Sequence, residues 1–403
     1  MSATTSSEPI AVPSVAATVF PIVAVIFTGY LVIGIAMPVL PLHVHQGLGF
    51  GTFVVGLVAG SQFGASLISR FTAGHLADSR GAKHAVVSGL LAAGLAGLLY
   101  LLSLRFVGAP IISLTTLLLG RAVLGSAESL MVAGALNWGL ALAGPRNTGK
   151  VMSWVGTAMY VAYAAGAPAG NALYAAQGFT GIAVATTLIP IATLLLVLPL
   201  SPVAPSPHAR PAVSKVLRAV WVPGLGLALS SVGYGAITTF VVLLFAQRGW
   251  DQAWIAITVV SLAFILGRLV FGHLPDRVGG PQVALVCVGI EAAGQALIWL
   301  ASSAVLVFAG AAIAGIGYSL VYPGFGVEAV RRAPPESRGL AMGAYTACLD
   351  LALGIASPVL GLIASGASIN SVFLASTLIV LSAGAIATRL LRTASLNTER
   401  NSR

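Results

Sequence analysis

Residues Arg70–Lys83 read RFTAGHLADSRGAK, a short polar stretch between two long apolar runs. A related stretch, RLVFGHLPDRVG, begins 198 residues later at Arg268 and ends at Gly279. Six of the twelve aligned positions are identical. A repeat at so large a fixed offset indicates a chain that is built from two similar halves.

The composition points to a membrane protein. The chain has 403 residues, of which 58% are hydrophobic and only 7% are charged, whereas a soluble domain carries roughly 25% charged residues. Most of the surface is therefore expected to face a lipid bilayer. The net charge of +10 does not indicate nucleic-acid binding, because the basic residues lie in short loops between apolar runs and not on one face of a domain.

A membrane span needs about 20 apolar residues, and the chain contains twelve candidates. They are 15–42, 52–74, 85–104, 111–136, 151–176, 180–200, 216–246, 253–274, 282–301, 304–330, 339–365 and 369–391. With twelve spans, the tails and even-numbered loops hold seventeen Lys and Arg residues, and the odd-numbered loops hold Arg105 and Arg248. Because positive charge favours the cytoplasmic side, both termini are predicted to be cytoplasmic.

The middle of the chain divides six spans from six. The segment from Ser201 to Val216 contains four prolines and is the best candidate for a linker. The expected domains are an N-terminal tail (1–14), a first six-helix bundle (15–200), a cytoplasmic linker (201–215), a second bundle (216–392) and a C-terminal tail (393–403). A second repeat, Gly120–Leu130 against Gly310–Leu320, matches at five of eleven positions. Two parallel six-span halves are a known transporter plan.

The loop motif resembles that of the major facilitator superfamily, G-x-x-x-D-[RK]-x-G-x-[RK]. In the first copy Gly74, Asp78, Gly81 and Lys83 fit it and Ser79 departs from it; the second copy keeps Gly272, Asp276, Arg277 and Gly279 but has Pro281 at its last basic position. The resemblance implies an all-α membrane protein with twelve transmembrane helices in two pseudo-symmetric six-helix bundles.

Further stretches narrow the resemblance. The runs around Trp138–Trp154 and Gly317–Pro323 look most like the YfcJ/YhhS-like bacterial transporters, which implies the inner membrane. Arg121–Gly125 resembles the family's fourth-span R-x-x-x-G pattern. Gly166–Gly170, with Pro168 at its centre, looks like a degenerate form of the fifth-span motif of the proton-antiporter branch.

In the family the loop motif acts as a latch that breaks when the halves rock. We expect this role for Asp78, with Arg80 or Arg70 as its positive partner, and a static loop clasp is the alternative. For Asp276 a latch and a static loop clasp are equally expected. Gly74 and Gly81 are expected to let the backbone turn tightly or approach a neighbour closely.

Ionisable residues inside spans are costly unless they have a partner or line a cavity. Arg121 and Glu128 are seven residues apart on one predicted helix, so they share a face about 10 Å apart. Asp350 is the acid in the interior of the eleventh span. These three are the candidates for proton coupling or substrate binding, and buried structural pairs are the alternative. Glu291 is expected to be a structural hydrogen-bonding residue.

Aromatic and amide side chains in glycine-rich spans could line a central cavity, although packing is an equal alternative for each. The candidates are Tyr30, Asn137, Trp138, Tyr160, Tyr234 and Tyr318. His43 and His45 are not expected to bind a metal, because further ligands are missing. No cofactor is expected, and the sequence contains no phosphate-binding loop for ATP.

These observations predict a monomeric secondary transporter of the inner membrane, not an enzyme, that exports a small organic solute or a drug-like or sugar-like compound by proton antiport. The proton gradient would supply the energy. The alternative is a proton symporter that imports a sugar or an organic anion. A membrane sensor is disfavoured because no soluble domain of useful size lies outside the spans. A channel is disfavoured because two repeated halves predict alternating access.

Overall fold

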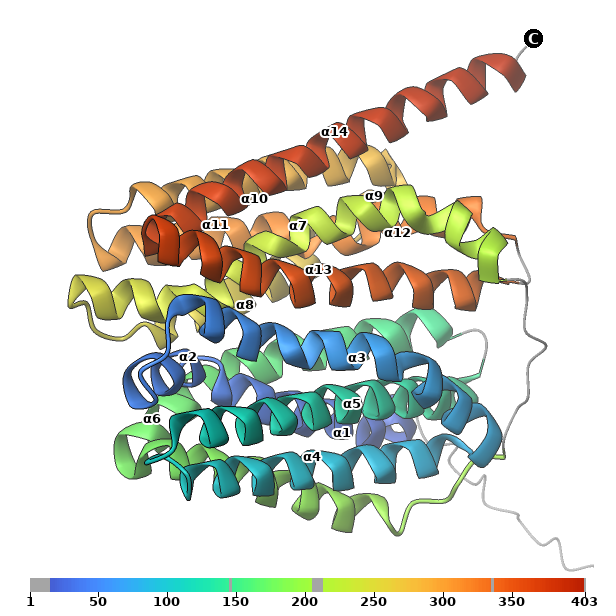
Figure 1. Cartoon of the computed structure of the whole chain (residues 1–403). Helices are drawn as coiled ribbons and strands as arrows, with labels where there is room; N and C mark the ends of the chain where they lie inside the picture. Colours follow the sequence, from blue (N-terminus) through green and yellow to red (C-terminus); the bar gives the residue numbers. More distant parts are fainter. Residues whose placement is uncertain (1–14, 145–146, 205–212, 335–336, 402–403) are drawn as a thin grey trace, which may run out of the picture.

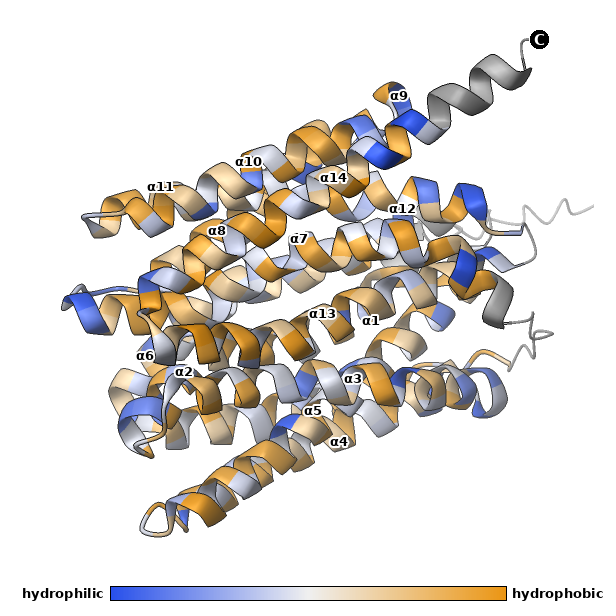
Figure 2. Ribbon diagram, turned by 45° about the horizontal axis from the view of Figure 1, so that its top comes forward, coloured by the Kyte–Doolittle hydropathy of each residue, from blue (hydrophilic) through white to orange (hydrophobic). Residues whose placement is uncertain are grey.

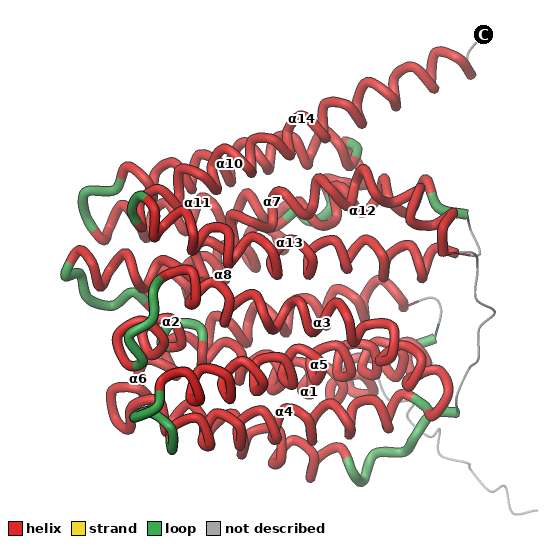
Figure 3. The backbone as a smooth tube through the Cα atoms, in the orientation of Figure 1, coloured by secondary structure: helices red, strands yellow, loops and turns green. Residues whose placement is uncertain are grey.

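The computed structural model describes residues 15–144, 147–204, 213–334 and 337–401. The predicted N-terminal tail and most of the predicted linker lie outside these ranges. All regular elements in the described ranges are helices (Figure 3), so the prediction of an all-α chain is confirmed.

The first half contains seven helical elements. They are α1 (Val15–Ala36), α2 (Leu40–Leu42), the π-helix η1 (His43–Gly47), α3 (Thr52–Arg80), α4 (Ala82–Leu104), α5 (Pro110–Ala143) and α6 (Thr148–Val197). The second half contains eight, which are α7 (Val213–Arg248), α8 (Trp254–Phe271), α9 (Leu274–Val278), α10 (Gly280–Leu300), α11 (Ala304–Ser319), α12 (Val321–Arg332), α13 (Arg338–Gly366) and α14 (Ile369–Asn401).

The described chain has 11 helical segments that are long and apolar enough to cross a membrane. One of them lies within α6, whose 50 residues would extend about 75 Å as one straight helix. The backbone of α6 breaks at Gly178, with φ 62° and ψ −156°. This left-handed conformation suits glycine, and it divides α6 into two spans. The described residues thus contain the twelve predicted spans.

The two halves lie side by side with their helices roughly aligned (Figure 1). Helix α3 packs against α13 and α6 packs against α8, and these two pairs join the halves. We call the end of the bundle that carries residues 198–204 the linker end. The opposite end, which carries α2 and η1, is the far end. In Figure 1 the linker end lies at the right.

The outer helix surfaces carry large apolar side chains, for example Phe20, Ile68, Ile111 and Val305, each at least 69% exposed. Hydrophilic residues gather toward the two ends of the bundle (Figure 2). This distribution fits a bilayer around the middle of the molecule, because exposed apolar area of this extent is costly in water.

The loop motif lies mostly on a helix. Helix α3 continues to Arg80, beyond the predicted end of the second span at Gly74. A Cβ atom on Gly74 would meet nothing within 4 Å, so the expectation of a tight turn or close contact there is wrong. At Gly81 and at its counterpart Gly279, φ is 96° and 108°. Here the expectation for Gly81 is confirmed, because the positive φ lets α4 begin directly after α3.

Candidate functional site

A polar stripe runs along the inner face of α3. Gln62, Ser66 and Arg70 follow one another at intervals of four residues, which places them on one helix face. Gln62 and Ser66 are fully buried. The stripe lies against α5 of the same half and α13 of the other half. Gln62 and Ser66 were not among the residues predicted from the sequence, although their spacing with Arg70 inside an apolar span is a signal that could have identified them.

The carboxyl group of Glu128 on α5 is bound on both oxygens. Tyr30 donates its hydroxyl to Oε1 at 2.9 Å, and Gln62 donates Nε2 to Oε2 at 2.8 Å. Arg121 is also buried, but its Nε donates to the backbone carbonyl of Val58 at 3.3 Å. The two candidates therefore lie on one helix as expected, but they bind different partners.

Asp350 on α13 forms an ion pair with Arg70 across the two halves. Its Oδ2 accepts hydrogen bonds from Arg70 Nε at 3.1 Å and from Ser66 Oγ at 3.3 Å. The Asp350 side chain is 3% exposed and that of Arg70 is 25% exposed. The expectation that Arg70 serves as the partner of Asp78 is therefore wrong in this structure.

Side chains of α3 form a polar network with both acids, because Gln62 donates to Glu128 and Ser66 donates to Asp350. The Ser66 hydroxyl also lies 3.0 Å from the hydroxyl of Ser129. Ser129 in turn donates to the backbone carbonyl of Ser66 at 2.8 Å. The network thus contains one acid from each half, and α3 lies between them.

Aromatic rings continue this network through the middle of the molecule. Tyr30 contacts Tyr163 edge-on with ring centroids 5.6 Å apart, and Tyr163 contacts Tyr160 in the same way at 5.9 Å. Tyr160 also contacts two rings of the second half. Its ring stacks on that of Phe264 with centroids 3.5 Å apart, and it lies edge-on to that of Tyr234 with centroids 5.8 Å apart.

Tyr234 stacks on Tyr318 at 5.4 Å. Four of the six candidate cavity residues, Tyr30, Tyr160, Tyr234 and Tyr318, therefore lie in one aromatic cluster that joins the halves. Asn137 lies outside it and is exposed toward the linker end, and its neighbour Trp138 is buried.

The first copy of the loop motif makes contacts within its own half. Asn137 Nδ2 donates to Asp78 Oδ1 at 3.1 Å. Lys83 Nζ donates to the backbone carbonyls of Leu198 and Leu200 at 2.6 and 2.7 Å. In the second copy Asp276 and Arg277 are exposed on α9. These contacts fit a clasp in the state described here.

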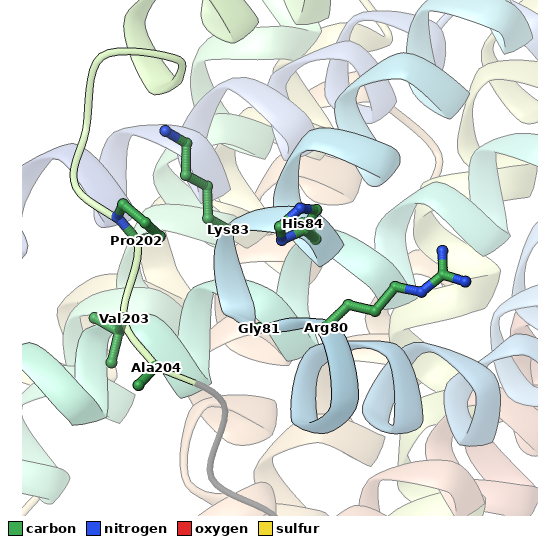
Figure 4. Close-up of a pocket in the computed structure, with 7 residues that line it drawn as sticks. All are labelled: Arg80, Gly81, Lys83, His84, Pro202, Val203 and Ala204. Carbon is green, nitrogen blue, oxygen red and sulfur yellow. The ribbon is translucent and has the colours of Figure 1, made fainter.

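A pocket of about 350 Å³ opens beside the first copy of the motif (Figure 4). It lies between the α3–α4 turn and the segment after α6, and it is lined by Arg80, Gly81, Lys83, His84, Pro202, Val203 and Ala204. Its basic lining fits a position at an end of the bundle, outside the apolar middle.

The bond between Asn137 and Asp78 supports a prediction for the clasp. The Asn137→Ala variant is expected to lose about 0.5–1 kcal/mol of stability, because one exposed hydrogen bond is removed. The combined Asp78→Ala and Asn137→Ala variant should be no less stable than Asp78→Ala alone, because Asp78→Ala already removes the acceptor. Thermal unfolding of the four purified proteins measures this, and additive losses would show that the two residues act through different contacts.

Among the described residues, no group of three or more His, Cys, Asp or Glu side chains is placed to hold a metal ion. The ring of His43 stacks on Phe179 with centroids 4.0 Å apart. His45 Nδ1 lies 2.7 Å from the carbonyl of Phe50. Each histidine thus makes its own local contact.

Comparison with known proteins places the family profile and the similar proteins in one family. The profile of the family described as Major Facilitator Superfamily matches residues 22–279 and 224–403. An MFS-type transporter of Salmonella typhimurium is 40% identical over 94% of this chain and 98% of its own length. The MFS-type transporter YhhS of Escherichia coli K12 is 39% identical over 91% of this chain and 89% of its own length.

Solved structures share the fold at low sequence identity. A bacterial homologue of the human lysosomal transporter Spinster, in an inward-facing and occupied conformation, gives a TM-score of 0.74 at 13% identity and covers 96% of this chain and 98% of its own. A D-xylose–proton symporter gives 0.73 at 13% identity, with 92% and 97% covered. The expected fold of twelve helices in two bundles is thus confirmed.

Proposed function

The chain belongs to the major facilitator superfamily, and we propose that it exports a small organic solute across the inner membrane in exchange for protons. The observation that carries this proposal is the pair of buried acids, Glu128 and Asp350, one in each half and each bound by a side chain of α3. Transporters of this plan bind their cargo near the midplane between the halves, which rock about the site.

The Arg70–Asp350 pair supplies a physical route for coupling. While Asp350 is ionised, its attraction to Arg70 holds α13 against α3. A proton on Asp350 removes its negative charge and hence most of this attraction. Protonation therefore weakens one contact between the halves and favours their separation.

The orientation follows from the charge count. We propose that the linker end faces the cytoplasm, in line with the excess of Lys and Arg there. The halves touch toward the far end, where Thr52 donates to the carbonyl of Gly361 at 2.8 Å. In this orientation the state described here is closed to the outside, and solute would enter from the cytoplasm.

The aromatic cluster supports an organic solute. Tyr160 and Phe264 stack face to face from opposite halves. A flat apolar or ring-shaped group could take the place of one ring when the halves part, since stacking needs no fixed polar partner. Ordinary inorganic ions would gain little from such a surface.

Import with protons is the second candidate. It is favoured by Arg121, whose buried guanidinium group binds a backbone carbonyl. An organic anion could bind this group through its carboxylate. Uptake into right-side-out vesicles would reveal this direction.

The direct test uses everted vesicles with an acidified lumen and a fluorescent pH reporter. A panel of sugars, organic acids and amphiphilic cations is added, and vesicles without the protein serve as control. Alkalinisation of the lumen by one class would support antiport and identify the class. If no class of solute changes the lumen pH, and one class accumulates together with protons in right-side-out vesicles, proton-coupled import replaces antiport as the proposed function.

The Glu128→Gln variant is expected to lose most of its gradient-driven transport, because the amide of glutamine does not take up and release a proton at neutral pH. Glutamine has nearly the same shape and keeps an oxygen for Tyr30, so the fold should survive. Solute exchange without a gradient should persist, which counterflow in proteoliposomes measures. Full gradient-driven transport in this variant would remove Glu128 from the coupling scheme.

A further inference from the structure

A third buried acid lies in the second half, outside the network described above. Glu291 on α10 is fully buried. Its Oε2 accepts a hydrogen bond from Ser230 of α7. Its Oε1 has no hydrogen-bond partner. A buried polar atom without a partner is rare and calls for an explanation.

The groups that face Glu291 bring no positive charge. The titratable groups within electrostatic range of Glu291 are Cys287, one turn away on α10, Tyr318 on α11 and Tyr160 on α6. Helix α7 contributes Ser230 and α14 contributes Ser376, which binds the neighbouring Gln295 at 2.9 Å. None of these side chains is cationic.

An ionised carboxylate with one hydrogen bond and no counter-ion is very costly inside a protein, and such a group takes up a proton instead. The neutral acid removes this cost.

The first half supplies an internal comparison. At the offset of 198 residues that relates the two loop motifs, Glu291 and Gln295 correspond to Ala93 and Gly97 on α4. Ala93 is fully buried, and α4 occupies the same place in its half as α10 does in the second. The first half is therefore built without an acid at this position.

Glu291 is connected to the aromatic cluster through a short part of α7. A Cβ atom on Gly233 would lie 2.6 Å from Glu291 Oε1, which shows how closely α7 approaches the carboxyl group. The hydroxyl of Ser231, next to Ser230, lies 2.9 Å from that of Tyr318. Tyr234, one residue after Gly233, stacks on Tyr318. A change of charge at Glu291 would act directly on helix residues that hold the cluster.

We propose that Glu291 is a second proton-binding site, separate from the Glu128–Asp350 network. It holds a proton in the state described here and releases it when α7 moves or water enters. Glu291 and its hydrogen-bond donor Ser230 both lie in the second half, and the proposal does not depend on the solute or on the direction of transport.

Infrared difference spectroscopy of the protein in lipid bilayers tests this proposal. A protonated carboxyl group gives a C=O stretching band that is distinct from the bands of a carboxylate. At neutral pH, we expect the carboxylic band to remain when the spectrum of Glu291→Gln is subtracted from that of the wild type. The Asp350→Asn variant should still show this band. On alkalinisation this band should disappear while the protein stays folded. Carboxylate bands alone at neutral pH would overturn the proposal, as would a carboxylic band that persists until unfolding.

The Ser230→Ala variant provides an independent measurement should Glu291→Gln fail to fold. It removes the hydrogen bond to Oε2 and leaves the acid in place. The same C=O band is expected to shift to higher frequency, because a carbonyl without a hydrogen bond vibrates faster. An unchanged spectrum would show that the band arises elsewhere and would contradict the assignment to Glu291.

Discussion

Proton-driven transport is expected to disappear in the Asp350→Asn variant, with a loss of stability of about 2–3 kcal/mol. The reason lies in Arg70, which keeps its charge in a mostly buried position after its partner becomes neutral. Breaking a buried ion pair by removing one partner costs several kcal/mol, and the partial exposure of Arg70 reduces this loss.

A double-mutant cycle separates stability from coupling. The Arg70→Gln and Asp350→Asn changes together remove both charges, so no unpaired charge remains. The double variant is expected to regain most of the stability that Asp350→Asn loses, while transport stays absent. Thermal unfolding in detergent and the everted-vesicle assay measure the two effects. Restored transport in the double variant would show that the pair is structural only.

Glu328 offers a matched control for this cycle. It pairs with Arg331 and Arg332 within α12 and thus does not connect the halves. The Glu328→Gln variant is expected to lose a similar amount of stability, about 2–3 kcal/mol, because Glu328 and Arg332 are buried to nearly the same extent as Asp350 and Arg70. Its transport should stay close to that of the wild type. A loss of transport as large as that of Asp350→Asn would mean that breaking any ion pair stops the transport cycle.

The fold could be predicted from the sequence because its determinants are local. Apolar runs of the right length define the spans, and the repeat of RFTAGHLADSRG as RLVFGHLPDRVG divides them into halves. Helix ends were less predictable. The polar residues after Gly74 look like a loop, yet α3 continues to Arg80, because polar side chains at the end of a bundle can be solvated on a helix as well as in a loop.

The site could be predicted only in part. Glu128 and Asp350 are conspicuous because acids inside spans are rare. Their partners are not, because Gln62 and Ser66 are uncharged residues that occur in many spans. The pairing of Arg70 with Asp350 joins residues 280 positions apart in the chain, and no helical or repeat period relates them. Only the packing of α3 against α13 reveals this contact.

That same packing leads to a second large effect, at Gly56. In the Gly56→Ala variant the new Cβ atom would lie 2.1 Å from the carbonyl oxygen of Ser357 and 2.9 Å from Pro358 Cα. Both are backbone atoms of α13, so no side-chain rotation relieves the clash. Overpacking of this kind costs about 1–3 kcal/mol, and this cost falls on the state in which the halves touch.

The population is therefore expected to move toward a state that is open at the far end. A bias of about 1–3 kcal/mol shifts a two-state equilibrium by about 5- to 150-fold. Spin labels at Gln46 and Asp251, which are exposed at the far end in opposite halves, report the change as a longer distance. The background replaces Cys287 and Cys348 by Ala, since both are free. Transport should fall by about tenfold or more, because one state of the cycle becomes poorly populated.

Gly64 supplies the matched control on the same helix. A Cβ atom there would meet nothing within 4 Å, so Gly64→Ala should leave the label distance unchanged. Its stability should stay equal or rise by up to about 1 kcal/mol, because alanine favours a helix more than glycine does. The two variants differ only in where one methyl group lies relative to α13. If their label distances were the same, contact between α3 and α13 at Gly56 would not control the far end. If only Gly56→Ala lengthens the distance, these two helices form the gate that must open during transport.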